Sequence, residues 1–418
     1  KELGISNSKY GIIQSAVSLV NTILPIFGGI FIDIFGTWIG SILATSLIAV
    51  GNIFVALSAN LRSFAMMVIG RTLYGIGSGT IVIVQTAILS HWFKGKGLAI
   101  AVGTQISVSR LASFLSNLTV VPIWESTGFY GWALWFSALL CVISLIINII
   151  YIFLMKILHD ELSRHEMKKI KQKKKFSPKK LLVFPNIFWI FVLLEFGLGS
   201  AWTSFLHTQT ELIKVRWNST DKYAAFASSI AQFLPIFVSP FLGHFLDLIM
   251  SSIFLTISMC LLGFVELTPI VIIMGTICFS ISLSLGPVVL LSSIPIIMPL
   301  DYVGTALGID KSSSNIGSTI YDILVGILQD KDGGKYGMVM RFYLGNSVCV
   351  IFISILLFFV SKNWRNGILD MKEDERKRKR AIVKVKDYNK PIKMNYFYIA
   401  IFIALLITSW VLFFNYIN

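Results

Sequence analysis

Two arginines stand inside apolar stretches of this sequence, where a charge needs a partner. Arg71 and Arg110 lie in two predicted helices that are joined by a short basic turn, Trp92-Phe-Lys-Gly-Lys96. An arginine at the bilayer centre costs roughly 2.5 to 3.5 kcal/mol even on the mildest scale, so it faces a protein interior or a watery cavity. We interpret the two helices as walls of a cavity that receives an anionic group.

Arg110 is the candidate for the binding contact. It lies about 13 residues into its helix, which is roughly 20 Å of rise and close to the bilayer midplane. A guanidinium offers a planar fork of donors that fits a carboxylate, so we predict a carboxylate clamp. The alternative is a structural salt bridge to another helix. Helical spacing places three further polar residues on the same face: Ser107, Ser113 and Asn117.

Glu195 is an acid inside the first predicted helix of the second half of the chain. An intramembrane carboxylate is a functional candidate by default. By α-helical spacing, Gly199 and Trp202 share its face. Three roles stay open for Glu195: a contact to a substrate amino group, a proton carrier, or neutralisation of Arg110. Further along the helix, His207 and Gln209 reach either a vestibule or a structural contact, and Asp322 is a cavity or interhelical group.

A second set of charged residues suits gating rather than substrate contact. Arg71 either joins helices or forms a gate. Asp33 and Asp247, at matching helix ends, are expected to hold those ends together. Asp310 and Lys311 are adjacent and point to different faces; they serve either a gate or an interface at which long side chains snorkel.

The composition defines the scaffold that must position these groups. The chain has 418 residues, of which 55% are hydrophobic and only 14% charged, and its mean hydropathy is +0.77. Lipid tolerates only helices and closed barrels, and apolar runs of about 20 residues are helical spans. The sequence therefore predicts an all-α polytopic membrane protein. It shows no metal-ligand spacing, nucleotide loop or hydrolase triad, so we expect no cofactor, no metal and no enzymatic activity.

Twelve spans are predicted, near residues 10–34, 39–60, 64–90, 97–121, 131–155, 187–209, 222–247, 251–269, 271–298, 303–328, 338–361 and 396–416. The charge of +15 collects in alternate loops, chiefly Lys156–Lys180 and Lys362–Lys393. This pattern indicates a cytoplasmic side rather than a nucleic-acid partner. The basic segments either bind anionic lipid or are solvated loops. The opposite side carries Asn218-Ser219-Thr220, a sequon that predicts glycosylation at Asn218.

The long basic segment divides the chain into halves that begin alike. Gly29-Ile-Phe-Ile-Asp33 in the first half matches Gly243-His-Phe-Leu-Asp247 in the second, as in transporters built from parallel repeats. The predicted parts are an N-terminal bundle, 1–155; a basic loop, 156–186; a C-terminal bundle, 187–361; a charged segment, 362–395; and a further helix, 396–418.

These motifs resemble the major facilitator superfamily. Gly28-Gly29-x-x-x-Asp33-x-x-Gly36 is similar to its signature between helices 2 and 3, and Arg71-x-x-x-Gly75-x-Gly77 is similar to its helix 4 motif. More closely, the chain resembles the MFSD1-like family of lysosomal dipeptide transporters. The residues that carry this likeness are Gly4-Ile-Ser-Asn-Ser-Lys9, Gly75-Ile-Gly77, Gln85, Trp92-Phe-Lys-Gly-Lys96, Gln105-x-Ser107-x-x-Arg110 and Gly304-Thr-Ala-x-Gly308.

The resemblance implies a fold of two pseudo-repeated bundles and adds Gln85 to the candidate substrate contacts. Since the signature follows the first span, helix 1 is expected to be missing from this chain, and 396–416 is an extra helix. In animal relatives an acid stands where Gly79 stands here, so the contact to a substrate amino group is in question. The resemblance also implies a homodimer and a glycosylated accessory subunit.

The interpretation is an alternating-access transporter of a small carboxylate-bearing solute, by resemblance a dipeptide, in a lysosomal or vacuolar membrane. The resemblance implies passive uniport. One alternative is a proton-coupled organic-anion carrier with Glu195 as its proton site. Another is a receptor or scaffold that moves nothing and works through its basic loop and charged tail.

Overall fold

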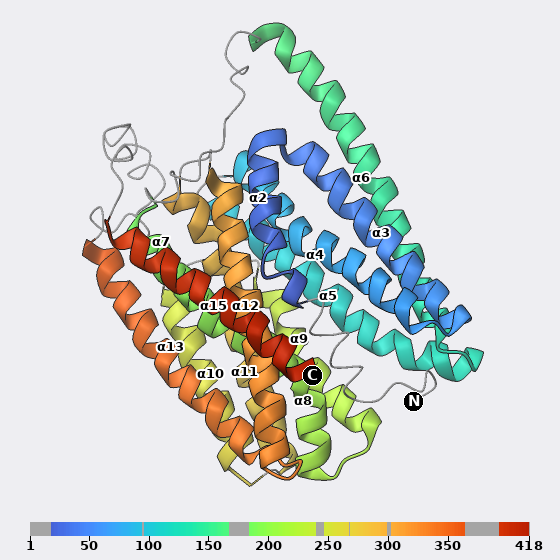
Figure 1. The fold of residues 1–418 in the computed structure, drawn as a ribbon, viewed down its shortest axis with the longest axis vertical. Helices are drawn as coiled ribbons and strands as arrows, with labels where there is room; N and C mark the ends of the chain where they lie inside the picture. Colours follow the sequence, from blue (N-terminus) through green and yellow to red (C-terminus); the bar gives the residue numbers. More distant parts are fainter. Residues whose placement is uncertain are drawn as a thin grey trace. The chain divides into compact units, whose positions relative to one another are not determined.

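The computed structural model describes residues 18–93, 96–166, 184–239, 246–266, 268–298, 302–363 and 393–417. Within these ranges the regular structure is helical throughout (Figure 1). The helices are α2 (Leu24–Phe35), α3 (Thr37–Leu61), α4 (Phe64–Trp92), α5 (Lys96–Thr127), α6 (Gly131–Glu166), α7 (Asn186–Leu194), the π-helix η2 (Glu195–Gly199), α8 (Ser200–Trp217), α9 (Asp221–Val238), α10 (Leu246–Phe264), α11 (Pro269–Ile297), α12 (Val303–Lys331), α13 (Gly337–Asn363) and α15 (Lys393–Ile417).

Nine helices in the described ranges are long and apolar enough to cross a membrane, and α7, η2 and α8 form one of them, Asn186–Trp217. The helices α2 and α9 have shorter apolar stretches, and α12 is a continuous helix of 29 residues. Each predicted span contains a helix, which confirms the all-α prediction. Residues 10–17 of the first predicted span lie outside the described ranges.

Three predicted loop boundaries were wrong because helices continue past their apolar parts. The α6 helix runs to Glu166, into the basic segment that was predicted to be a loop from Lys156. The α5 helix runs to Thr127, past the predicted span end at residue 121, and α8 runs to Trp217, past the predicted span end at residue 209. Hydropathy marks the lipid-length part of a helix, whereas polar residues can extend the helix beyond it.

The chain forms two compact units. The first is drawn from Lys1–Ile88, Thr119–Ser177 and Leu300–Ser312, and the second from Leu89–Leu118, Pro178–Pro299 and Ser313–Asn418. Because the boundaries fall inside α4, α5 and α12, each of these helices has residues in both units. The division into bundles 1–155 and 187–361 stays a prediction.

Small residues and polar contacts join the helices of the first unit. A Cβ added at Gly51 of α3 would lie 2.5 Å from the Tyr74 backbone nitrogen of α4, and one at Gly77 would lie 2.6 Å from the Ala44 oxygen of α3. Asn148 Nδ2 of α6 donates to Thr45 Oγ1 of α3 at 3.0 Å. In lipid, close backbone approach and interhelical hydrogen bonds drive such packing. Apolar burial contributes no driving force there, because lipid tails are as apolar as the side chains of a neighbouring helix.

Serine hydroxyls play the same part in the second unit. Ser258 Oγ of α10 donates to the Gly275 oxygen of α11 at 2.8 Å, and Ser252 of α10 meets Ser354 of α13 at 2.8 Å between hydroxyl oxygens. The predicted extra helix, α15, is present and contacts the start of α7. Asn395 Nδ2 donates to the Phe184 oxygen at 2.7 Å.

Candidate functional site

Arg110 lies near the middle of α5, in the part of that helix that belongs to the second unit. Leu98, Val102 and Ile106 of α5 form a buried cluster with Val288 of α11. On another side of the helix, Phe114 contacts Phe233 of α9 with 5.8 Å between ring centroids. These apolar contacts fix the rotation of α5 and so the direction of Arg110.

The Arg110 guanidinium is half-buried, and no described side chain or backbone carbonyl forms a hydrogen bond or an ion pair with it. The alternative of a structural salt bridge therefore finds no partner in the described part of the chain. A charge held in this way retains its full set of donors for a ligand.

The polar residues predicted beside Arg110 have different surroundings. Ser107 is buried, and its hydroxyl donates to the Pro235 oxygen of α9 at 3.1 Å, which is a helix-to-helix contact. Ser113 donates to the Ser109 oxygen in its own helix. Asn117 lies on α5, but its side chain is outside the described set. Gln85 is exposed on α4. Their substrate contacts stay predictions.

The position of Gly79 has no room for an acidic side chain, which the resemblance implies at this position in animal relatives. A Cβ built on Gly79 would lie 2.9 Å from Asn21 Cγ and closer still to Asn21 Oδ1. Asn21 belongs to the turn that precedes α2 and is 7% exposed. An amide from another segment thus occupies the space that an acid on α4 would need.

Glu195 begins a π-helix, which was not visible in the sequence. The five residues Glu195–Gly199 interrupt the span formed by α7 and α8. Asn346 Nδ2 of α13 donates to the Gly197 oxygen at 3.2 Å, and the Tyr321 hydroxyl of α12 donates to Asn346 Oδ1 at 2.6 Å. Two neighbouring helices therefore support the bulge. Single π-turns inside α-helices are frequent at functional sites.

The Glu195 carboxylate folds back over Gly199, beside α12. A Cβ on Gly199 would lie 2.6 Å from Glu195 Oε1 and 2.7 Å from Ser314 Oγ. Glu195 itself is half-buried. The missing side chain at Gly199 therefore leaves the space in which the carboxylate and the serine hydroxyl lie together.

Trp202 does not share the Glu195 face, so that expectation from helical spacing was wrong. Its ring is 4% exposed, and its Nε1 donates to Ser282 Oγ of α11 at 3.0 Å. A π-turn closes its hydrogen bond at i→i+5 and so takes one more residue than an α-turn, and positions beyond it therefore rotate away from the face that α-helical spacing predicts. Ser200, one residue further than an α-turn predicts, donates instead toward α12, to the Ser314 oxygen at 3.2 Å.

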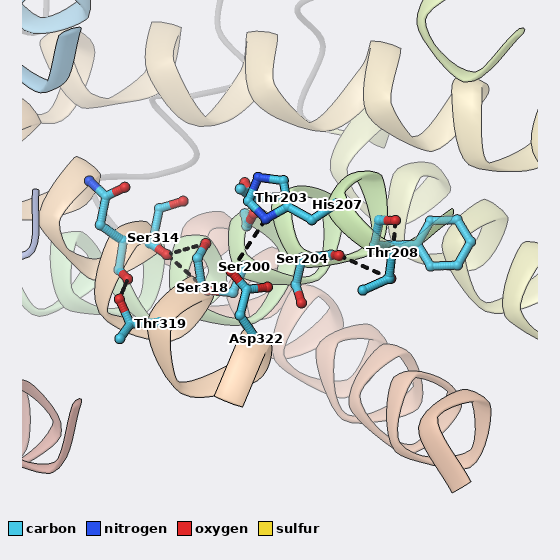
Figure 2. A network of polar contacts seen from close by, with 12 residues as sticks. Ser200, Thr203, Ser204, His207, Thr208, Ser314, Ser318, Thr319 and Asp322 are labelled. Carbon is cyan, nitrogen blue, oxygen red and sulfur yellow. Dashed lines mark hydrogen bonds and ion pairs between the residues drawn. The ribbon is translucent and has the colours of Figure 1, made fainter. Parts of the chain in front are cut away.

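A polar network follows this face of α8 (Figure 2). Ser204 and the Tyr343 hydroxyl of α13 lie 2.8 Å apart, between oxygens. His207 Nδ1 and Asp322 Oδ2 of α12 lie 3.3 Å apart. Asp322 is thus an interhelical group, one of its two predicted roles. Gln209 is wholly buried rather than in a vestibule.

Asp33 lies in the last turn of α2 and accepts hydrogen bonds from the first turn of α12. The donors are the Gly304 nitrogen at 3.2 Å, the Thr305 nitrogen at 2.8 Å and Thr305 Oγ1 at 2.6 Å. A carboxylate here satisfies free amide groups and complements the positive end of the helix dipole. A Cβ on Gly304 would lie 2.8 Å from the Gly29 oxygen, so both glycines allow this close approach.

The other predicted gating residues lie on three different helices, α12, α10 and α4. Asp310 is 1% exposed and does not snorkel to an interface, which corrects one of its two predicted roles; Lys311 next to it is half-buried. Asp247 lies in the first turn of α10. Arg71 is half-buried on α4, and its Nε has no hydrogen-bond partner among the described residues.

Asn218 is exposed and caps α8 in the left-handed conformation, with φ of 49°. The side chain is therefore accessible, and its glycosylation stays a prediction. Within the described residues, no group of three or more His, Cys, Asp or Glu side chains could hold a metal ion.

Comparisons with known proteins agree on one fold. The family model of the Major Facilitator Superfamily matches residues 1–321. The chain is 26% identical over 417 residues to the lysosomal dipeptide transporter MFSD1 of Mus musculus, covering 90% of this chain and 83% of that protein. Among solved structures, the proton:xylose symporter XylE aligns with a TM-score of 0.67 at 15% identity, over 85% of this chain and 88% of that one. The human organic anion transporter MFSD10 aligns with a TM-score of 0.62 at 16% identity, over 82% and 83%.

Proposed function

The chain belongs to the Major Facilitator Superfamily, and from that premise we propose that it carries dipeptides across a lysosomal or vacuolar membrane by alternating access. Superfamily membership makes it a multi-pass membrane transporter of a small solute. The mouse relative, whose name includes both the lysosome and dipeptides, supports the finer proposal. The observation on which this proposal depends most is that the Arg110 guanidinium, halfway along α5, has no described partner.

Arg110 binds the carboxylate end of the solute in this proposal. An arginine in a low-dielectric site without an acid beside it carries an uncompensated charge. A carboxylate that accepts two parallel N–H bonds from the guanidinium removes that cost. The solute is therefore an integral part of the charge balance of the site.

Glu195 receives the amino end. The Asn21 side chain fills the space beside Gly79, so an acid from another helix has to meet the ammonium group. The π-turn holds the Glu195 carboxylate beside Ser314 Oγ, and these two groups offer acceptors for the N–H bonds of an ammonium. A free α-carboxylate and a free α-amine are the two features that every unmodified dipeptide has.

Asp33 supplies the gate. Its bonds to the α12 amide groups join the end of α2 to the start of α12 within the first unit. Breaking them would expose both the carboxylate and the helix terminus. A contact of this kind can be made in one state of the transport cycle and opened in the next.

Uptake of labelled Ala-Ala and Lys-Ala into proteoliposomes tests the proposal. We expect competition by free dipeptides, a loss of competition by dipeptide amides, and a separate loss by N-acetyl dipeptides. Arg110→Lys should reduce uptake at least tenfold and weaken the penalty for amidation, because lysine keeps the charge but lacks the bidentate fork. Glu195→Gln should abolish the penalty for acetylation.

Arg341→Lys is the matched control, because Arg341 is exposed on α13; it should keep both uptake and selectivity. If no dipeptide in a broad panel is transported or raises the melting temperature, the dipeptide assignment fails. If transport occurs but Arg110→Lys retains full selectivity for a free carboxylate, the clamp is assigned to the wrong residue.

A further inference from the structure

The π-turn η2 is bound from two sides, by a closed set of contacts that includes α12 and α13. The Phe196 ring, in the turn, meets the Tyr321 ring of α12 edge-on with 6.0 Å between centroids, and Tyr321 meets Phe342 of α13 edge-on at 5.0 Å. The Tyr321 hydroxyl donates to Asn346 Oδ1 of α13 at 2.6 Å. Asn346 Nδ2 donates back to the Gly197 oxygen of the turn at 3.2 Å. All of these residues belong to the second unit.

Both ends of the Asn346 amide are used. The Gly197 oxygen can only accept, so the amide turns its NH2 group toward that oxygen and its own oxygen toward the Tyr321 hydroxyl, which donates. Within the helix the Gly197 oxygen accepts from the Ser200 nitrogen, three residues further on, in a geometry poorer than that of an α-turn. A Cβ on Gly197 would lie 2.7 Å from Val350 Cγ2, so the glycine lets α13 approach the turn and supply the second donor.

The π-turn also sets how α8 is rotated relative to α7. Ser313 Oγ of α12 donates to the Val192 oxygen of α7 at 2.8 Å, and Ser200 Oγ of α8 donates to the Ser314 oxygen of α12 at 3.2 Å. Val192 and Ser200 are eight residues apart, which in an uninterrupted α-helix is about 80° more than two full turns. A π-turn takes one more residue, so the two contacts come within about 20° of the same face. The turn therefore allows α12 to bind both α7 and α8.

The place of the Glu195 carboxylate depends on this turn. Glu195 is the first residue of η2 and Gly199 is the last, and a Cβ on Gly199 would lie 2.6 Å from Glu195 Oε1 and 2.7 Å from Ser314 Oγ. The carboxylate thus reaches from one end of the turn to the other. The Asn346 bond is made at Gly197, the middle residue of the turn, so it holds the segment whose two ends define where the carboxylate lies.

From this arrangement we propose that Asn346 is a positioning residue for recognition of the amino end of the solute. It holds the π-turn, and the turn holds the Glu195 carboxylate where an ammonium group meets it. Tyr321 acts one step further away, because its hydroxyl and its two ring contacts fix the Asn346 amide. This inference rests on the proposed function, in which Glu195 receives the amino end, and adds to it the residues on which that selectivity depends.

Competition against uptake of labelled Ala-Ala into proteoliposomes measures the two ends of the dipeptide separately. The acetylation penalty is the ratio of half-inhibiting concentrations of N-acetyl-Ala-Ala and Ala-Ala, and the amidation penalty is the same ratio for Ala-Ala amide. The wild-type acetylation penalty should be at least about tenfold, as for loss of a hydrogen bond to a charged group. Asn346→Leu should lower it at least about threefold, because a misplaced carboxylate forms a longer and weaker bond. The amidation penalty should stay unchanged, since it depends on Arg110.

Tyr321→Phe keeps the aromatic ring and removes only the hydroxyl. It should lower the acetylation penalty in the same direction by a smaller factor. In a protein that already carries Asn346→Leu it should have no further effect on this penalty, because Tyr321 acts through Asn346 and the two changes are therefore not additive.

Two matched controls remove one interhelical hydrogen bond each, away from the π-turn. Tyr343→Phe loses the hydroxyl that lies 2.8 Å from Ser204 Oγ, and Asn148→Leu loses the amide that donates to Thr45 Oγ1 at 3.0 Å. Both variants should keep both penalties at the wild-type value, whatever happens to their melting temperatures. The controls separate the positioning of Glu195 from a general loss of helix packing.

An Asn346→Leu variant that melts earlier but keeps the wild-type acetylation penalty overturns the inference, because Asn346 then only joins helices. An equal fall of both penalties also overturns it. If Asn346→Leu does not fold, Tyr321→Phe decides in its place, and an unchanged acetylation penalty in that variant is the contrary result. A wild type that transports dipeptides without any acetylation penalty instead removes the role of Glu195 in the proposed function, and the inference with it.

Discussion

Two arginines on membrane-length helices, one at a helix end and one in the middle of a helix, differ in whether they have a hydrogen-bond partner. Arg216, in the last turn of α8, donates through Nη1 to the Leu262 oxygen at 2.5 Å and to the Gly263 oxygen at 2.9 Å, at the end of α10. Arg110, in the middle of α5, has no such contact within the described ranges. A cation that binds backbone carbonyls stabilises a helix end, whereas a cation without a partner is available to a ligand.

The same contrast holds for two acids, Asp33, which contacts the first turn of α12, and Asp322, which lies on α12. Both oxygens of Asp33 accept from the helix terminus. Only one oxygen of Asp322 has a described partner, and that distance is 3.3 Å. An unsatisfied buried polar atom is costly, and the Asp33 carboxylate avoids this cost through its bonds to α12. The comparison therefore separates structural charges from candidate working charges.

Exchanging each arginine for glutamine gives the largest expected effect. Arg110→Gln should reduce dipeptide uptake about 100-fold, since hydrogen bonds between charged groups contribute about 1.5 to 3 kcal/mol each. Its melting temperature should stay near that of the wild type. Arg216→Gln should do the reverse, lowering the melting temperature while leaving substrate selectivity intact. Equal transport loss in both variants, measured in proteoliposomes, would erase the distinction between the two arginines.

Crowding the Asp33 contact should have the next largest effect. Gly304→Ala adds a Cβ 2.6 Å from Asp33 Oδ1 and 2.8 Å from the Gly29 oxygen, and overpacking of this kind costs about 1 to 3 kcal/mol. Thermal unfolding in detergent measures the change. Gly345→Ala is the control, because a Cβ there meets nothing within 4 Å; that variant should be neutral or slightly stabilised.

Removing the Asp33 carboxylate should destabilise the protein by about 0.5 to 2 kcal/mol, as loss of a helix cap does. Asp33→Ala should also make the first turn of α12 exchange its amide hydrogens faster, which hydrogen exchange with mass spectrometry detects. Unchanged protection of the peptide around Thr305 would mean that the contact contributes little to holding that end of α12.

The smallest effect is expected at Trp202. Trp202→Phe keeps an aromatic ring but loses the Nε1 bond to Ser282, a change of about 1 kcal/mol in stability for one hydrogen bond. Uptake and its competition by dipeptides should be unchanged, because the indole lies in the packing between α8 and α11. A selective loss of dipeptide affinity in this variant would return Trp202 to the binding site.

The sequence by itself determined the helical class, and a helix lies in each predicted span, because a lipid-length apolar run has no alternative to a helix. It also identified Arg110, Glu195 and Asp33, since charges inside such runs are rare and therefore visible. The motif likeness gave the superfamily that the family model then matched.

Only the tertiary structure decided which side chains meet. Helical spacing assigns faces correctly as long as the helix is α-helical throughout, and the π-turn at Glu195 breaks that condition, so Trp202 turns to α11 and Ser200 to α12. The Asn21 side chain against Gly79 and the His207–Asp322 pair join residues 58 and 115 positions apart in the sequence. No local pattern encodes such partners, because packing between helices selects them.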